Sequence, residues 1–363
     1  MDDVHFMKTA IREARKGLGR TSPNPAVGAV IVSHGKVVGK GYHKMAGSPH
    51  AEVNAIMSAA AKSKGATLYV TLEPCNHYGR TPPCTKAILD SGIFRVVVGM
   101  KDPNPSVAGG GCDYLASRGV EVQTGILEEE CLGINRPFIK YIQQRIPWIA
   151  LKAGLSLDGK IAASTGQSGW ITNDKSRRWV HILRNRYDGI LVGIDTVIQD
   201  NPSLTTRIAR GKGKDCVRII LDTHLRIPLD AKVVRQKSNS YTLVYCGKAY
   251  DVTSKKNLEK AGVIVQPVKT RKDGYVDLQE VLKDIGRREI TSVFVEGGSK
   301  VHASFIQQQL ADKAYLFFAP IFIGGDGLPV TSGFGLESVR EAYRLTGIQT
   351  KKFGDDVLIE GFF

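Results

Sequence analysis

The stretch at residues 67–84, TLYVTLEPCNHYGRTPPC, joins a short apolar run to two proline–cysteine pairs. The run at 67–72 predicts a buried strand, because it is apolar and bounded by turn-forming residues. Cys75 follows that strand on a loop, and Cys84 opens the next predicted helix. A helix N-terminus favours the negative charge of a thiolate. The sequence therefore predicts a metal site where a strand, a loop and a helix meet.

A histidine and a glutamate upstream complete a set of residues suited to hydrolytic deamination. His50 and Glu52 lie at the predicted start of a helix over 50–62, where first-turn side chains can curl around the helix end. Zinc held by three protein ligands lowers the pKa of bound water from ~15.7 to ~7, and a carboxylate that is not a ligand can carry protons. We predict that His50, Cys75 and Cys84 bind zinc and that Glu52 is the catalytic acid and base.

Two less specific interpretations fit the same residues. Isolated cysteines are often buried apolar residues, and a Cys/Cys/His set can form a structural zinc site with His77 or His43 as the fourth ligand. A purely structural site has no need for a carboxylate two residues from its histidine, or for a proline before each cysteine. These features favour a catalytic centre.

Helical and strand patterns alternate around the proposed zinc ligands, which predicts an α/β/α sandwich. After residue 146 the alternation begins again, so we place one domain at 1–146 and a second α/β domain at 147–363. In the first domain the predicted elements are a helix near 4–18, strands at 27–32 and 37–42, a strand at 94–99, a helix–strand pair to about 123 and a helix near 128–143. In the second, strands are predicted from Trp148 and at 189–193, 217–222, 241–246, 292–296 and 313–319.

Composition restricts the class of protein. The 363 residues are 42% hydrophobic and 23% charged, as expected of a globular protein with two cores. The formal charge of +15 suits a polyanion or a phosphorylated small molecule. Six dispersed cysteines and the lack of a signal-peptide or membrane-spanning pattern predict a cytoplasmic protein.

The spacing of the cysteines points to a particular family. His-x-Glu followed by Pro-Cys and a second Cys resembles the cytidine and nucleotide deaminases, but eight residues separate the cysteines here instead of two. That spacer, with TSPNPAVGAVIV, HAEVNAI and DPNPSVAGGG, resembles the deaminase domain of the bifunctional riboflavin-biosynthesis deaminase–reductases. The resemblance implies a cytidine-deaminase-like fold and a contact between Asn24 and the pyrimidine.

The second domain resembles the reductase half of the same family. KAGLSLDGKIA, SGWIT, ILVGIDTVIQDNPSLTTR, VRIILDT and VFVEGGS occur in that order, which implies a dihydrofolate-reductase-like fold and NADPH as cofactor. The resemblance implies that the dinucleotide contacts Gly154, Trp170, Thr196, Asp200, Thr223 and the segment Gly298, Ser299, Lys300, Val301, His302, Ala303 and Ser304. It implies that the substrate contacts Ser168, Arg184, Leu204, Arg207 and Glu296.

Physical chemistry supports part of this assignment. Arg184 and Arg207 suit a phosphate, because a guanidinium offers paired donors of fixed geometry. The glycine pair before a predicted helix start, at Gly297 and Gly298, can let a pyrophosphate approach backbone amides, although a tight turn explains it equally. We take Lys152 and Asp200 as catalytic candidates for proton handling, while a strand lysine can also extend to the surface.

These expectations define a two-step enzyme. The first domain would hydrolyse an amino group from 2,5-diamino-6-(5-phosphoribosylamino)pyrimidin-4-one, and the second would reduce the ribosyl chain with NADPH. We expect a small-molecule phosphoribosyl pyrimidine as substrate, no nucleic-acid or membrane partner, and a homo-oligomer. The main alternative is a zinc deaminase acting on tRNA or another nucleic acid, and a more distant one is a non-catalytic zinc protein. The long cysteine spacer and an aromatic content of 7% disfavour the nucleic-acid alternative.

Overall fold

The computed structural model describes residues 2–78, 82–104, 110–167, 169–208 and 213–363. The chain divides into two compact units, Met1–Arg145 and Ile146–Phe363. Each unit is an α/β fold built on its own sheet, as the sequence predicted. Within the described ranges, no helix combines the length and apolar character needed to cross a membrane.

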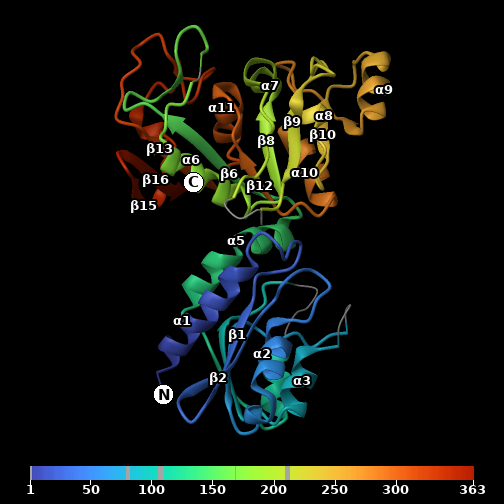
Figure 1. Ribbon diagram of the computed structural model, residues 1–363, viewed down its shortest axis with the longest axis vertical. Helices are drawn as coiled ribbons and strands as arrows, with labels where there is room; N and C mark the ends of the chain where they lie inside the picture. Colours follow the sequence, from blue (N-terminus) through green and yellow to red (C-terminus); the bar gives the residue numbers. More distant parts are fainter. Residues whose placement is uncertain (1, 79–81, 105–109, 168, 209–212) are drawn as a thin grey trace. The chain divides into compact units, whose positions relative to one another are not determined.

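The first unit is a three-layer sandwich. Its sheet has the order β2-β1-β3-β4-β5, and α1 and α5 cover one face while α2 and α3 cover the other (Figure 1). Strand β3 pairs with β1 and β4, which explains why all six of its side chains are buried. The elements are α1 Asp3–Ala14, β1 Gly28–Ser33, β2 Lys36–Tyr42, α2 Ala51–Ala59, β3 Thr67–Leu72, α3 Cys84–Asp90, β4 Arg95–Met100, α4 Gly111–Ser117, β5 Glu121–Thr124 and α5 Glu128–Gln144.

Helix α1 shows how local sequence determines these elements. The Asp2 side chain accepts a hydrogen bond from the His5 amide and so caps the helix N-terminus. Phe6, Met7, Ala10 and Ile11 recur at helical spacing and are buried against the sheet. An amphipathic pattern and a cap residue were therefore sufficient to predict this helix.

The second unit has a nine-stranded sheet in the order β11-β10-β9-β8-β12-β6-β13-β16-β15. Strands β11 to β13 along that order are parallel, and the hairpin β15–β16 adds to β13 in the antiparallel sense. A two-stranded sheet joins β7 to β14. The strands are β6 Trp148–Leu155, β7 Lys160–Ala162, β8 Gly189–Gly193, β9 Val217–Leu221, β10 Thr242–Cys246, β11 Val263–Pro267, β12 Ser292–Val295, β13 Lys313–Phe318, β14 Leu328–Pro329, β15 Thr346–Phe353 and β16 Asp356–Phe362.

Helices cover both faces of this sheet. Alternate residues of β8 show the division, because Leu191 packs with residues of α10 and α11 while Ile190 and Val192 pack with residues of α7, α8 and α9. Residues of α6 pack beside β13 and β16. The helices are α6 Asp174–Arg184, α7 Ile194–Asp200, α8 Lys232–Arg235, α9 Val252–Lys260, α10 Leu278–Arg287 and α11 Ser299–Gln307.

Candidate functional sites

Two helix N-termini in the first unit bring the predicted metal ligands together. His50 is the N-cap residue of α2, Cys84 is the first residue of α3, and Cys75 lies on the loop after β3. The His50 Nδ1 atom lies 3.2 Å from the Cys84 sulfur and 3.5 Å from the Cys75 sulfur. All three ligand atoms lie within 4.8 Å of one another. One imidazole and two thiols within this distance are a donor set suited to a single zinc ion.

The two thiols already differ in their affinity for a proton. A hydrogen bond from the Cys84 thiol lowers the pKa of Cys75, and the same contact raises the pKa of Cys84. The Cys84 backbone N–H also donates to the Cys75 sulfur at 3.4 Å. The loop and helix therefore stabilise the Cys75 thiolate before a metal binds, and metal binding would release the proton of Cys84.

Glu52 lies next to these ligands without being one of them. It is the second residue of α2 and only 3% exposed. Burial raises the pKa of its carboxyl to about 7, and the negative charge of the Cys75 thiolate contributes. A carboxyl with this pKa can accept and return a proton near neutral pH, as general acid–base catalysis requires.

Asn24 and His43 form a hydrogen-bonded chain beside His50. The Asn24 amide nitrogen lies 3.2 Å from His43 Nε2, and His43 Nδ1 lies 3.3 Å from the Pro49 carbonyl. Both ring nitrogens of His43 are thus engaged away from the metal group. His77 is exposed, and among the described residues the metal group contains neither histidine. A structural zinc site would need His43 or His77 as a fourth ligand. Among the described residues, neither histidine joins the metal group.

The loop that carries Cys75 is held by residues that sequence reasoning missed. The Glu73 carboxylate accepts hydrogen bonds from the backbone N–H groups of Cys112 (3.0 Å) and Asp102 (3.2 Å). A Cβ atom on Gly111 would lie 1.9 Å from the Pro74 carbonyl oxygen, so only glycine allows this approach. Sequence offered one signal, the glycine run ending at Gly111, but not its contact.

The second unit has a cleft of about 1000 Å³ at the carboxyl ends of its central strands. Strands β6, β8 and β12 end there, where the chain order along the sheet reverses and a crevice is expected. Several predicted residues line the cleft: Lys152, Gly154, Trp170, Arg184, Thr196, Asp200, Leu204, Arg207, Glu296 and Gly298, Ser299, Lys300, Val301 and His302. Three others, Thr223, Ala303 and Ser304, are not among the lining residues, and Ser168 lies outside the described residues.

Thr223 is engaged elsewhere in the fold. Its hydroxyl accepts a hydrogen bond from the Val276 backbone N–H at 3.3 Å, and its carbonyl accepts one from the Gly247 N–H at 2.9 Å. Trp170, by contrast, is 78% exposed at the cleft, and the Arg177 guanidinium lies 4.3 Å from its ring centre. The structure therefore places Trp170 on a surface that a ligand can reach.

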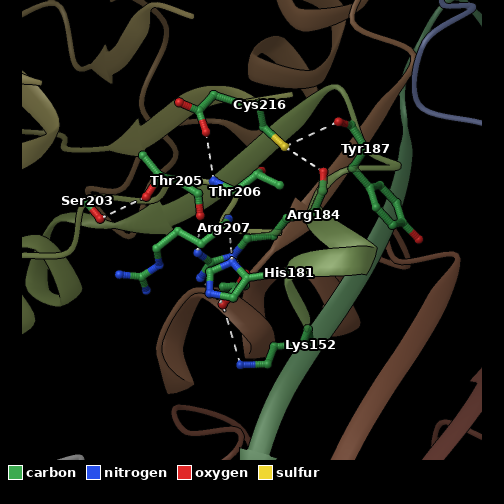
Figure 2. Close-up of polar contacts among 11 residues, drawn as sticks. Lys152, His181, Arg184, Tyr187, Ser203, Thr205, Thr206, Arg207 and Cys216 are labelled. Carbon is green, nitrogen blue, oxygen red and sulfur yellow. Dashed lines mark hydrogen bonds and ion pairs between the residues drawn. The ribbon is translucent and has the colours of Figure 1, made fainter. Parts of the chain in front are cut away.

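An ion-pair network lies inside the cleft. Glu296, whose side chain is 9% exposed, accepts two hydrogen bonds from Arg184, at 2.5 Å from Nε and 2.9 Å from Nη2. Lys152 Nζ lies 3.5 Å from the same carboxylate, so this strand lysine faces the cleft network (Figure 2). Burial alone would raise the pKa of Glu296, but Arg184 and Lys152 outweigh it and lower that pKa to about 2. The sequence suggested Arg184 for phosphate, whereas its guanidinium is bidentate to Glu296.

The N-terminus of α11 presents two polar atoms without hydrogen-bond partners. Ser299 and His302 are each 3% exposed, and neither the Ser299 hydroxyl nor His302 Nε2 has a partner among the described residues. His302 Nδ1 lies 3.3 Å from the Val330 carbonyl. Buried polar atoms normally have partners, so a ligand with polar groups fits here. Such a helix end suits a dinucleotide.

The turn before α11 depends on a close approach. A Cβ atom on Gly297 would lie 2.8 Å from the Val301 side chain. The glycine is therefore required by the turn, and ligand binding at this helix end stays a prediction.

Comparison with known families agrees with both units. Residues 1–100 match the cytidine and deoxycytidylate deaminase zinc-binding region. Residues 147–359, more than half of the chain, match the RibD C-terminal domain.

Relatives match this chain over nearly its whole length. The chain is 45% identical to the riboflavin biosynthesis protein RibD of Aquifex aeolicus, over 98% of this chain and 97% of that protein. It is 43% identical to the protein of the same name from Bacillus amyloliquefaciens, over 98% and 95%. A solved Thermotoga maritima structure, described as a diaminohydroxyphosphoribosylaminopyrimidine deaminase/5-amino-6-(5-phosphoribosylamino)uracil reductase, is similar with a TM-score of 0.86 and 40% identity, covering 99% of this chain and 97% of that one.

Proposed function

Because this chain belongs to the RibD family of bifunctional riboflavin-biosynthesis deaminase/reductases, we propose that its two units catalyse consecutive steps on one phosphoribosyl pyrimidine. The domain at 1–146 deaminates 2,5-diamino-6-(5-phosphoribosylamino)pyrimidin-4-one. The domain at 147–363 then reduces the ribosyl chain with NADPH to give 5-amino-6-(5-phosphoribitylamino)uracil. The observation that carries the proposal is the group formed by His50, Cys75 and Cys84, together with the buried, non-ligating Glu52 on the helix turn that begins at His50.

In the deamination step, Glu52 transfers protons. When zinc is bound it supplies water acidic enough to attack at neutral pH. Glu52 accepts a proton from the attacking water and donates one to the amino nitrogen, which leaves as ammonia when its bond to the ring carbon breaks. Its pKa of about 7 suits both transfers. Asn24, oriented by its contact with His43, is the residue that we propose to hydrogen-bond the pyrimidine.

In the reduction step, the cleft residues bind the two ligands and supply a proton. NADPH, when bound, supplies a hydride. The N-terminus of α11, with Ser299 and His302, would hold the dinucleotide, and Arg207 would hold the substrate phosphate. As the C1′–O4′ bond of the sugar breaks, the proton on the glycosidic nitrogen passes to O4′, and the resulting C1′=N imine carbon is the position that a hydride would reach.

Lys152 and Asp200 both line this cleft and are the proposed proton-handling residues. Lys152 is held by Glu296, and its ammonium can donate the proton that the reduced nitrogen acquires. Asp200, at the end of α7, is the second candidate.

Two measurements on the full-length protein test the proposal. Zinc content and ammonia release should be measured together on the diaminopyrimidine phosphate, with about one zinc per chain expected. Protein that holds zinc and releases no ammonia from this substrate would overturn the deaminase assignment and favour a non-catalytic zinc protein.

The reductase assignment has an internal probe. All three tryptophans, Trp148, Trp170 and Trp179, lie in the second unit, and Trp170 lines the cleft. NADPH should therefore quench tryptophan fluorescence saturably, and more tightly than NADH does. No quenching and no NADPH oxidation would overturn the assignment.

We also propose that the partners are small molecules and copies of the same chain. Gel filtration with light scattering should show a homo-oligomer. Filter binding of tRNA should be weak at near-physiological salt, because a phosphorylated small molecule already accounts for the positive charge; tight, salt-sensitive binding would instead favour a nucleic-acid deaminase.

A further inference from the structure

His181 occupies a central position in the reductase cleft that its sequence did not reveal. It lies on α6, three residues before Arg184, so the two side chains lie on the same helix face. Both line the cleft, together with Arg207 and Lys152. Figure 2 shows the imidazole among these three basic side chains.

One ring nitrogen of His181 is committed to the backbone. The Arg207 N–H donates a hydrogen bond to His181 Nδ1 at 3.2 Å. Since Nδ1 accepts this bond, it carries no proton, and the single ring proton of the neutral imidazole must be on Nε2. The contact therefore fixes the tautomer and leaves one donor, the Nε2–H group.

The surroundings keep this ring neutral. Burial lowers the pKa of His181 to about 4, and the charges of Arg184 and Arg207 act in the same direction. Protonating Nδ1 would also break its bond to the Arg207 amide. With these neighbours, His181 is a neutral imidazole that can donate one hydrogen bond through Nε2.

The other basic groups are used differently. Arg184 is bidentate to Glu296 and donates to the Thr205 carbonyl at 2.8 Å, and Lys152 pairs with the same carboxylate. Arg207 has an exposed side chain with no ion pair among the described residues. An anion entering this end of the cleft therefore meets two groups. One is the Arg207 guanidinium, and the other is the His181 Nε2–H donor, which the hydrogen bond from the Arg207 backbone N–H holds in place.

We propose that His181 is a substrate-specificity residue whose Nε2–H donates a hydrogen bond to the substrate phosphate that Arg207 neutralises. This inference rests on the proposed reductase function and names a residue that selects the phosphorylated substrate. It also explains why a histidine is useful here: one nitrogen positions the Arg207 main chain while the other contacts the ligand.

Two substitutions separate the nitrogens. In His181→Asn, the side-chain oxygen can replace Nδ1 as acceptor for the Arg207 amide, but nothing replaces the Nε2–H donor. In His181→Gln, the longer side chain can place an amide N–H near the Nε2 position, while the Nδ1 acceptor is lost. A donor to a charged group contributes about 10- to 100-fold in affinity.

The experiment measures reductase kinetics of the full-length variants on the phosphorylated product of deamination and on the same compound after phosphatase treatment. We expect His181→Asn to raise KM for the phosphorylated compound about 10-fold or more, with kcat within about threefold of wild type. Its KM for the dephosphorylated compound should match that of wild type. His181→Gln should show the smaller phosphate-dependent defect.

Inorganic phosphate as a competitive inhibitor gives a second readout, and its inhibition constant should weaken in His181→Asn more than in His181→Gln. The proposal is overturned if His181→Gln loses as much phosphate-dependent affinity as His181→Asn, or if both variants lose affinity equally for the two compounds. Wild-type enzyme in the same assay distinguishes the two hypotheses. If the reductase function itself is wrong, wild-type protein does not oxidise NADPH; if only the role of His181 is wrong, it does.

Discussion

Replacing Glu296 by glutamine should destabilise the second unit, because it removes the ion pairs of Glu296 with Arg184 and Lys152. The substitution keeps the size of the side chain and removes its charge. Arg184, whose side chain is 14% exposed, would then lose the carboxylate that accepts its Nε and Nη2 hydrogen bonds. Lys152 would lose the same partner.

The magnitude follows from the pKa of Glu296. Its pairing with Arg184 and Lys152 outweighs burial and lowers this pKa from 4.5 to about 2. At 1.36 kcal/mol per pH unit, that difference corresponds to about 3 kcal/mol of stability at pH 7. Breaking a buried ion pair by removing one partner typically costs ~3–5 kcal/mol, in agreement with this value.

The effect should depend on pH with a definite sign. A carboxylate whose pKa is lowered by folding stabilises the protein fully above the unfolded-state pKa of 4.5, and this stabilisation is lost as the pH falls through 4.5 towards about 2. The difference in unfolding free energy between wild type and Glu296→Gln should therefore decrease at pH 3 to less than half of its value at pH 7.

Urea unfolding followed by tryptophan fluorescence is the assay. Because all three tryptophans lie beyond residue 146, the signal of the full-length protein reports on the second unit alone. Glu337→Gln is the matched control, since Glu337 is exposed and should change the free energy of unfolding by less than about 0.5 kcal/mol. A loss below about 1 kcal/mol at pH 7, or a loss that is undiminished at pH 3, would refute the role given to this network.

Three further predictions concern the two sites. Glu52→Gln should retain zinc, measured by atomic absorption, while ammonia release falls about 10²- to 10⁴-fold; loss of the metal would show that Glu52 is a ligand. Gly111→Ala should weaken zinc affinity, measured by chelator competition, because its Cβ would lie 1.9 Å from the Pro74 carbonyl oxygen. Gly133→Ala, whose added Cβ in the interior of α5 would meet no other part of the protein within 4 Å beyond its own helix backbone, should bind zinc normally and be stabilised by up to about 1 kcal/mol. Arg207→Ala should raise the reductase KM at least 10-fold without changing ammonia release; equal loss of both activities would argue against separate sites.

The zinc group could be predicted from sequence because each ligand is placed by local structure. A strand end positions Cys75, and the starts of two helices position His50 and Cys84. Strand ends and helix starts are visible in the sequence as changes of pattern, so three short segments were enough to predict the ligands. The hydrogen bonds of His43 and the contact of Gly111 with Pro74 could not be predicted, because each joins segments that only tertiary packing brings together.

The cleft of the second unit was less accessible to sequence reasoning. Lys152 and Glu296 are 144 residues apart, and their pairing depends on the parallel contact of β6 with β12. Arg184 and Arg207 looked equivalent as phosphate ligands, yet only the structure shows that the first is bound to a carboxylate. His181 carried no sequence signal, since a single histidine on an amphipathic helix is usually a packing residue.

The C-terminal hairpin was also missed. Strand β15 has the sequence TGIQTKKF and is exposed along nearly its whole length, so it lacks the alternation that identifies a half-buried strand. Its backbone pairing with β16 maintains it at the edge of the sheet. Edge strands with lysines are common because they discourage pairing with other chains.

In the proposed function, one chain deaminates and then reduces the same pyrimidine phosphate. The most direct measurement follows ammonia release and NADPH oxidation simultaneously in one sample of zinc-loaded protein given 2,5-diamino-6-(5-phosphoribosylamino)pyrimidin-4-one. We predict that ammonia appears first, that NADPH oxidation follows after a lag, and that both reach the same stoichiometry. NADPH oxidation without ammonia release, or ammonia release with no NADPH oxidation at any cofactor concentration, would contradict this two-step function.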